Sequence, residues 1–292
     1  MLLRVLTGFA AMMITTPLAL SQTGPDPEVF PFATFDKASE PFLSDPHDLI
    51  IGPDGRLYVA DKFANRIAIL DRETLELVGS FGEGELSNPH DVDFDGAGRA
   101  IVADTGNSRV AIYDLSSGRA QFAGEIIGIA RTEGAVAHPN GRIYATASGF
   151  GSITAFENGE AVATAGGLSG AHDVQVDSSG NLWVADAFNR RVVQFSPELE
   201  LLAVFDGPQY GWSGPRYLDI DALGRLVVAD QDAHRILLID KDGTLAGVLG
   251  TGIPGEGPNR FDDPEGVEIA ESTYYFADSD NNRIVRYRIV MN

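Results

Sequence analysis

The chain contains no cysteine, which excludes disulfide bonds and thiolate metal sites. Basic residues are also scarce: 21 lysines and arginines stand against 42 aspartates and glutamates, and the formal net charge is -21. Nucleic acids and anionic membranes are bound mainly through clustered lysine and arginine, so we expect neither as a partner. A small molecule, a peptide or a metal ion remains open as a ligand, and we expect a monomer.

The first residues, MLLRVLTGFAAMMITTPLALSQ, place Arg4 before an apolar run that ends in Ala19-Leu20-Ser21, a small-x-small pattern typical of signal-peptide cleavage. The run is short and contains Pro17, which disfavours a retained membrane anchor. We expect residues 1–21 to be a signal peptide cleaved near Ser21, and residues 22–292 to be a single secreted or periplasmic domain. Removal of Arg4 with the leader changes the formal charge from -21 to -22.

One pattern recurs six times after the leader, most clearly in PHDLIIGPDGRLYVADKFANRIAILD from Pro46 and PHDVDFDGAGRAIVADTGNSRVAIYD from Pro89. The other copies begin at Thr132, Ala171, Pro215 and Pro264. Measured at one register, the successive steps are 43, 43, 39, 44 and 49 residues. Apolar residues alternate over short runs between turn signals such as Pro53-Asp54-Gly55, as in strands and hairpins. The pattern predicts an all-β fold, a six-bladed β-propeller.

The last copy lacks a fourth, outer strand, because Asn292 follows shortly after its third strand. The segment Val29 to Phe35 is β-like and belongs to none of the six copies. We predict that residues 28–36 pair as the outer strand of the last blade. This N-terminal strand would close the ring and leave only short sheet edges.

The recurring pieces P-x-[DG]-[LV], YVAD and NRI or SRV resemble NHL repeats over nearly the whole mature chain. The resemblance implies the propeller fold. It does not fix a function, because propellers host enzymes, binding platforms and scaffolds alike.

Two charged registers recur in five of the six copies and are interpreted as architecture, with the aspartate ending a strand and an arginine five residues later pairing back onto it. The aspartates are Asp61, Asp104, Asp186, Asp230 and Asp278, and the arginines are Arg66, Arg109, Arg191, Arg235 and Arg283. The third copy has Ala147 and Ser152 instead, beside a glycine-rich loop. Sequence drift and space for a ligand are both open explanations.

A third register begins the first strand of each copy and is polar in all six. It consists of His47, His90, Glu133, His172, Arg216 and Glu265. The innermost strand of a blade lines the channel, so we expect these side chains to converge at one mouth. A merely wet channel mouth and a functional site are both consistent with this pattern. The remaining histidines, His138 and His234, lie in turns and are expected to have structural roles, His138 at the surface.

Alternate blades carry His90, His172 and Glu265, a set that suits zinc with a fourth position open for water. The alternative metal set is His47, His90 and His172. Calcium would need more oxygen ligands, such as Glu133 and backbone carbonyls. No motif for an organic cofactor is present.

The P-H-x-[LIV] pieces at His47 and His90, with Ala171-His172, also resemble the peptidyl-hydroxyglycine amidating lyases, which are six-bladed propellers. That resemblance implies zinc held by three histidines in alternate blades, and a structural calcium. Here Glu265 replaces the third histidine, the cysteine pairs are missing, and no tyrosine occupies the family's catalytic position. We name Glu133, Arg216 and Tyr217 as candidate catalytic residues of a metal-dependent lyase or hydrolase.

The alternative function is a non-enzymatic propeller that binds a ligand or a protein. Aromatic residues in loops near the mouth suit ligand capture. The candidate ligand-binding residues are Phe63, Phe188, Tyr210 and Trp212. They are equally consistent with covering apolar sheet ends.

Overall fold

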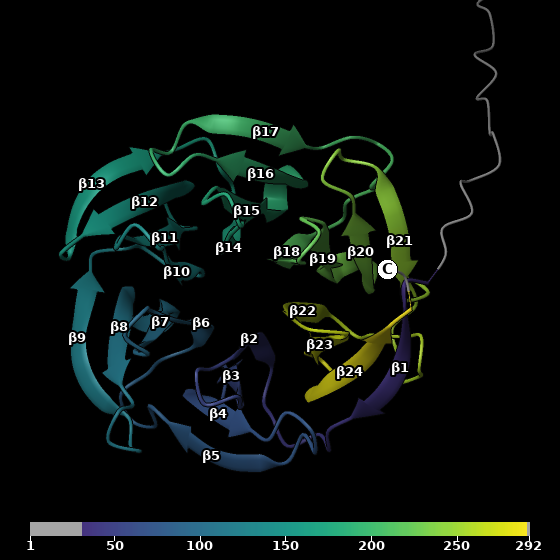
Figure 1. The fold of residues 1–292 in the computed structure, drawn as a ribbon, viewed down its shortest axis with the longest axis horizontal. Helices are drawn as coiled ribbons and strands as arrows, with labels where there is room; N and C mark the ends of the chain where they lie inside the picture. Colours follow the sequence, from purple (N-terminus) through teal and green to yellow (C-terminus); the bar gives the residue numbers. More distant parts are fainter. Residues whose placement is uncertain (1–30, 291–292) are drawn as a thin grey trace, which may run out of the picture.

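A computed structural model describes residues 31–290. The predicted signal peptide, residues 1–21, lies outside this range. The described chain forms six four-stranded antiparallel sheets arranged as blades around a central axis (Figure 1), as the repeat predicted. None of the helices in residues 31–290 is long and apolar enough to cross a membrane.

The strands follow the chain outward from the axis in each blade. Blade 1 comprises β2 (Pro46–Ile51), β3 (Leu57–Asp61), β4 (Arg66–Leu70) and β5 (Leu77–Phe81). Blade 2 comprises β6 (Pro89–Phe94), β7 (Ala100–Asp104), β8 (Arg109–Asp114) and β9 (Gln121–Ile127). Blade 3 comprises β10 (Ala135–Ala137), β11 (Ile143–Ala147), β12 (Ser152–Glu157) and β13 (Glu160–Ala165).

Blade 4 comprises β14 (Ala171–Val176), β15 (Leu182–Asp186), β16 (Arg191–Phe195) and β17 (Leu201–Phe205). Blade 5 comprises β18 (Pro215–Ile220), β19 (Leu226–Asp230), β20 (Arg235–Ile239) and β21 (Leu245–Leu249). Blade 6 comprises β22 (Pro264–Ala270), β23 (Thr273–Asp278), β24 (Arg283–Ile289) and β1 (Ala33–Ala38). Short 3-10 turns follow the second strand of blades 2, 4 and 5: η1 (Thr105–Asn107), η2 (Ala187–Asn189) and η3 (Gln231–Ala233).

The ring closes as predicted, with the N-terminal strand β1 on the outside of blade 6. Its pairing with β24 runs from Ala33 opposite Ile289 to Ala38 opposite Val285. The strand therefore lies a few residues later than the predicted segment 28–36, the start of which falls outside the described residues. Phe32, which is fully buried, packs edge-on against Tyr274 and anchors the closing strand in the core.

The second strand of each blade is buried on both faces, and the alternation of side chains along it divides the core between neighbouring blades. In β3, Leu57 and Val59 pack with Tyr275 of blade 6, whereas Tyr58 and Ala60 pack with Val92 of blade 2. This explains why the second strand of each blade is a continuous apolar run. The channel-lining strands are thereby held rigidly by apolar packing between blades.

The recurring Asp and Arg pairs are architectural, as interpreted from the sequence. Arg66 Nε lies 2.8 Å from Asp61 Oδ2, and Asp61 Oδ1 accepts the amide of Ser44 in the loop entering the blade. The same ion pair recurs in four other blades. In blade 3, Ala147 and Ser152 stand opposite one another in the sheet, and buried Ala147 belongs to an apolar core cluster.

Candidate functional site

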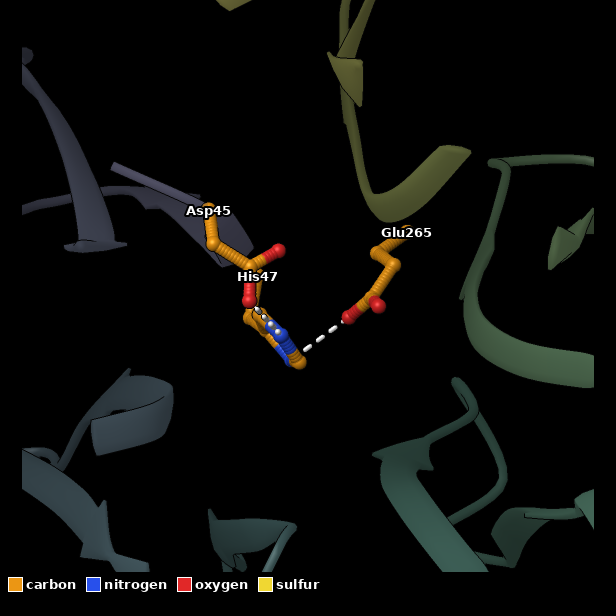
Figure 2. A group of neighbouring side chains, drawn as sticks. All are labelled: Asp45, His47 and Glu265. Carbon is orange, nitrogen blue, oxygen red and sulfur yellow. Dashed lines mark ion pairs between the residues drawn. The ribbon is translucent and has the colours of Figure 1, made fainter. Parts of the chain in front are cut away.

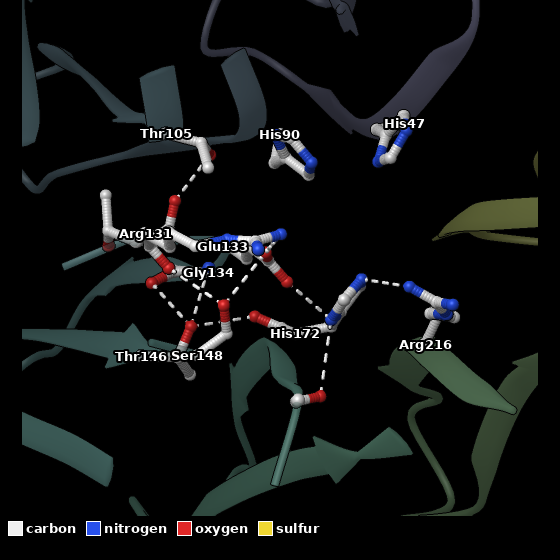
Figure 3. Close-up of polar contacts among 12 residues, drawn as sticks. His47, His90, Thr105, Arg131, Glu133, Gly134, Thr146, Ser148, His172 and Arg216 are labelled. Carbon is white, nitrogen blue, oxygen red and sulfur yellow. Dashed lines mark hydrogen bonds and ion pairs between the residues drawn. The ribbon is translucent and has the colours of Figure 1, made fainter. Parts of the chain in front are cut away.

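The six polar residues of the recurring register lie around one cavity of about 650 Å³ at the channel mouth. They converge because each stands at or just before the start of an innermost strand, and all six of these strands begin at the same end of the channel. The cavity brings together His47, His90, Glu133, His172, Arg216 and Glu265. Figure 3 shows the part of the ring formed by blades 1 to 5.

His172 is held from both sides of its ring (Figure 3). Its Nδ1 lies 2.6 Å from Glu133 Oε2, and its Nε2 lies 2.5 Å from Arg216 Nη1, which donates to it. Burial acts to raise the pKa of Glu133, but hydrogen bonds, the strongest of them from His172, outweigh burial and lower it to about 2. Glu133 is therefore ionised at neutral pH.

His90 has one ring nitrogen fixed and the other free. Its Nδ1 lies 2.8 Å from the carbonyl oxygen of Asn88, so Nδ1 carries the hydrogen and Nε2 carries the lone pair. Within residues 31–290, this Nε2 has no hydrogen-bond partner, and His90 lines the cavity. Burial, with a smaller contribution from His47, lowers the pKa of His90 well below its usual 6.5. His90 thus offers a neutral imidazole nitrogen to the cavity.

The Asn88 carbonyl that fixes His90 is itself held in place. Asn88 adopts a left-handed backbone with φ of +47°, and its amide donates to Asn65 Oδ1 at 2.8 Å. Asparagine tolerates this conformation better than most residues. The loops of blades 1 and 2 therefore orient the His90 ring together.

His47 lies beside His90, with the two ring centroids 4.4 Å apart, and between two carboxylates (Figure 2). Its Nδ1 is 2.5 Å from Glu265 Oε2, and its Nε2 is 3.4 Å from Asp45 Oδ2. Burial alone would lower the pKa of His47, but the nearby carboxylates, the charge of Glu265 first and then Asp45, raise it. Gln231 donates to the other Glu265 oxygen.

The structure gathers a different set of metal-ligand side chains from the predicted ones. Within residues 31–290, the one group of three with donor atoms within 4.8 Å of one another is Asp45, His47 and Glu265. The predicted set of His90, His172 and Glu265 does not form such a group, because both nitrogens of His172 already contact other ring residues. The set of three histidines does not either, and the rings of His90 and His172 are 6.5 Å apart.

Tyr217 forms the floor below these residues. It is fully buried, and its hydroxyl donates to the His90 carbonyl at 3.0 Å and lies 3.2 Å from His47 Nδ1. Burial, followed by the charges of Glu265 and channel aspartates, raises its pKa well above 10. Tyr217 therefore keeps its proton at neutral pH, and its contacts favour positioning of the two histidines over proton transfer.

The predicted aromatic residues separate into two pairs. Phe63 and Phe188 line the cavity and are 59% and 68% exposed. Lys62 lies over the Phe63 ring, and Arg216 over the Phe188 ring. The expectation was wrong for Tyr210 and Trp212, which are buried in the core between blades 4 and 5 and bond backbone carbonyls.

The two histidines outside the ring have structural roles. His138 is buried instead of lying at the surface as expected, and its Nε2 bonds the carbonyl of Gly180 in the next blade. His234 ends η3 in a left-handed conformation, and its Nδ1 accepts the amide of Asp263.

A second group of acids lies below the mouth, on the inner strands. These carboxylates are Asp48, Asp91, Asp93, Asp173, Asp219 and Glu268. Each accepts a backbone amide from the inner strand of the next blade; Asp173, for example, accepts Leu218 N at 2.8 Å. Burial raises the pKa of every one, to about 7 for Asp91 and Asp219. These acids connect the blades.

Several cavity residues were missed from the sequence. One register lies directly after the blade aspartate and contributes Lys62, Ser148, Gln231 and Ser279 to the cavity. Another lies two residues before the ring residue and contributes Asp45, Arg131, Gly170 and Asp263. Both could have been found by comparing neighbouring registers across the six copies.

Residues 86–113 match the family model of the NHL repeat. The second blade is an NHL repeat. This match agrees with the recurring pieces in the other blades of the NHL propeller. No curated protein matches the chain.

Solved structures with the same fold include a streptogramin B lyase, at 14% identity and TM-score 0.65, covering 88% of this chain and 96% of the lyase. A catalytically inactive histidine-to-alanine variant of virginiamycin B lyase from Staphylococcus aureus, with quinupristin, has 13% identity and TM-score 0.65 over 87% and 99% of the two chains. An auxiliary nutrient binding protein from Bacteroides thetaiotaomicron has 17% identity and TM-score 0.69, covering 89% and 75%. At these identities the likeness shows the propeller fold alone.

Proposed function

We propose that the channel mouth is the active site of an acid–base enzyme, a lyase or a hydrolase, in which His90 is the general base. The observation that carries the proposal is the bond from His90 Nδ1 to the Asn88 carbonyl. It leaves the lone pair of Nε2 available in a cavity large enough for a small molecule or a peptide end. In a lyase, His90 would take a proton from a substrate carbon; in a hydrolase, from the attacking water.

Arg216 is the group best placed to stabilise the negative charge that such a proton transfer creates. Within the described residues its guanidinium has no ion pair with a carboxylate, and its Nε is buried without a hydrogen-bond partner. The pairing of Glu133 with His172 fixes the imidazole that Arg216 contacts. Donors held in place before the reaction stabilise developing charge effectively.

The fold likeness is compatible with this proposal, because propellers of the same architecture include lyases. The amidating-lyase chemistry itself receives less support. The catalytic tyrosine of that family lies two residues after the blade aspartate, and this position holds Phe63 in blade 1 and Phe188 in blade 4. We propose that the substrate is a small molecule or a peptide, and that the protein acts outside the cytoplasm as an exported monomer.

The test is a panel of esters, lactones, depsipeptide lactones and peptidyl-hydroxyglycines, scored by mass spectrometry in water enriched in oxygen-18. A hydrolase incorporates the heavy oxygen into the carboxylate that it releases, whereas a lyase leaves the product carboxylate unlabelled. His90→Gln should reduce turnover by at least about 100-fold, the usual contribution of a general base. His138→Gln, at the other end of the inner strands, is the matched control. Turnover that survives His90→Gln would exclude His90 as the base.

A non-enzymatic binding propeller is the second candidate, favoured by the exposed rings of Phe63 and Phe188 at the cavity rim. Loss of ligand binding in Phe188→Ala, with no turnover in the parent, would support it. Phe122→Ala is a suitable control, because Phe122 is also exposed and packs against an arginine, but it lies on an outer strand.

A further inference from the structure

We infer that Asp45, His47 and Glu265 form a binding site for a divalent metal ion of the zinc class. Asp45 and His47 come from the start of blade 1 and Glu265 from the inner strand of blade 6, so the site joins the first and last blades at the mouth (Figure 2). The inference goes beyond the proposed reaction and does not depend on it, because metal content can be measured without a substrate.

Two buried atoms of this group contact other members of the group without a well-aligned hydrogen bond. Glu265 Oε2 lies 2.5 Å from His47 Nδ1, and His47 Nε2 lies 3.4 Å from Asp45 Oδ2. Within residues 31–290 neither atom has a hydrogen-bond partner in good geometry, although each side chain is only 3% exposed. Buried polar atoms without a partner are uncommon in proteins, and each calls for an explanation such as an ion or a water. The third ligand, Asp45, has a side chain that is 17% exposed, so it closes the group on the solvent side.

A further unsatisfied atom lies beside the group. Gln231 donates through its amide nitrogen to Glu265, while its Oε1 is buried without a partner. The amide thereby fixes the orientation of the Glu265 carboxylate, as supporting groups around metal ligands commonly do. Three buried acceptor or ligand atoms without a well-aligned hydrogen bond, on His47, Glu265 and Gln231, are thus concentrated at one side of the mouth.

The donor set indicates the class of metal. One imidazole and two carboxylates suit zinc and related transition metals, whereas calcium and magnesium prefer six or more oxygen ligands. Two carboxylates also balance the charge of a divalent ion. Lys62 already contacts Asp45 Oδ2 at 2.8 Å, so Asp45 is expected to be the weakest of the three ligands.

The test is zinc binding by the full mature chain, purified without an affinity tag, stripped with a chelator and titrated with zinc alone by calorimetry, with the metal content measured by elemental analysis. We expect one zinc per chain. Glu265→Gln and Asp45→Asn should each weaken zinc binding by at least about 10-fold. Two variants are used because Glu265 is buried; Asp45→Asn keeps the test valid if Glu265→Gln does not fold, as judged by circular dichroism.

The controls separate this site from the other possible ones. Glu268→Gln makes the same change three residues along β22, in the channel, and should leave zinc affinity unchanged. His172→Asn should also leave zinc affinity unchanged. If His90, His172 and Glu265 were the zinc ligands instead, this substitution would weaken zinc binding. The inference is overturned by no zinc uptake, by a loss in His172→Asn, or by full affinity in every folded variant of Glu265→Gln and Asp45→Asn. His90→Gln should bind zinc normally, so failure of the proposed reaction and failure of the metal site give different results.

Discussion

The mouth and the channel beneath it are both rich in buried carboxylates, but the two regions use them differently. At the mouth, Glu133 and Glu265 contact imidazoles in the lining of a cavity. In the channel, Asp173 and Asp219 accept backbone amides from the next blade. The pKa of Glu133 is lowered to about 2, whereas that of Asp219 is raised to about 7.

This difference shows how partners, more than burial, decide the role of an acid. A carboxylate bonded to a neighbouring strand is satisfied by the fold and contributes to ring assembly. At the mouth, atoms of Glu265, His47 and Arg216 lack a well-aligned hydrogen bond within the described chain. Unsatisfied buried groups around a cavity are the feature expected of a site that receives a ligand.

The largest predicted effect concerns the channel. The pKa of Asp219 in the folded protein, about 7, lies above its ordinary 3.8, because burial outweighs its hydrogen bonds. Its stabilising contribution is therefore complete below about pH 4 and is lost as pH rises through about 7. Asp219→Asn should remove this loss, which reaches up to about 4 kcal/mol at pH 8. Denaturant unfolding of parent and variant at pH 4 and pH 8 measures how the free energy of unfolding changes with pH; an equal change in the two proteins would contradict the account.

The mouth should show the opposite dependence on pH. The pKa of Glu133 is lowered, so its stabilising contribution is present above about pH 4.5 and is lost as pH falls through about 2. Glu133→Gln should therefore cost about 3 kcal/mol at pH 7, and the cost should shrink towards pH 2. Thermal melts of both proteins between pH 2 and pH 7 provide the measurement. A cost that does not shrink towards pH 2 would contradict the lowered pKa of Glu133.

A smaller effect is expected where the two regions meet. Tyr217→Phe removes the hydroxyl bonded to the His90 carbonyl and near His47, which should lower the free energy of unfolding by about 1 kcal/mol. Because Tyr217 is proposed to position both histidines, the imidazole nitrogen resonances of His47 and His90 should shift, while those of His138 stay unchanged. If the imidazole resonances of His47 and His90 do not shift, Tyr217 contributes to packing but does not position the two histidines.

The fold could be predicted from the sequence because each copy repeats the same short-range signals. Alternating apolar runs and turn residues define the strands, and the missing outer strand of the last copy identified the N-terminal segment as its replacement. The placement of that strand was off by a few residues, since Phe32 and not the strand itself provides the buried anchor.

The site could be predicted only in part. The register of His47 and His90 correctly indicated which side chains converge. Their pairing could not be read from spacing, because it depends on side-chain direction: Arg216 contacts His172, and Glu265 contacts His47. Tyr210 and Trp212 were misassigned because an aromatic residue in a loop has the same sequence pattern whether it points into a cavity or into the core.

The most direct test of the account is nitrogen-15 NMR of the imidazole rings in the chelator-treated mature protein at neutral pH. The contact with the Asn88 carbonyl predicts that His90 is the neutral form with its hydrogen on Nδ1, and that it titrates well below the usual 6.5. A His90 ring with its hydrogen on Nε2, or one that is charged at pH 7, would contradict the assignment of this residue as the base of the mouth.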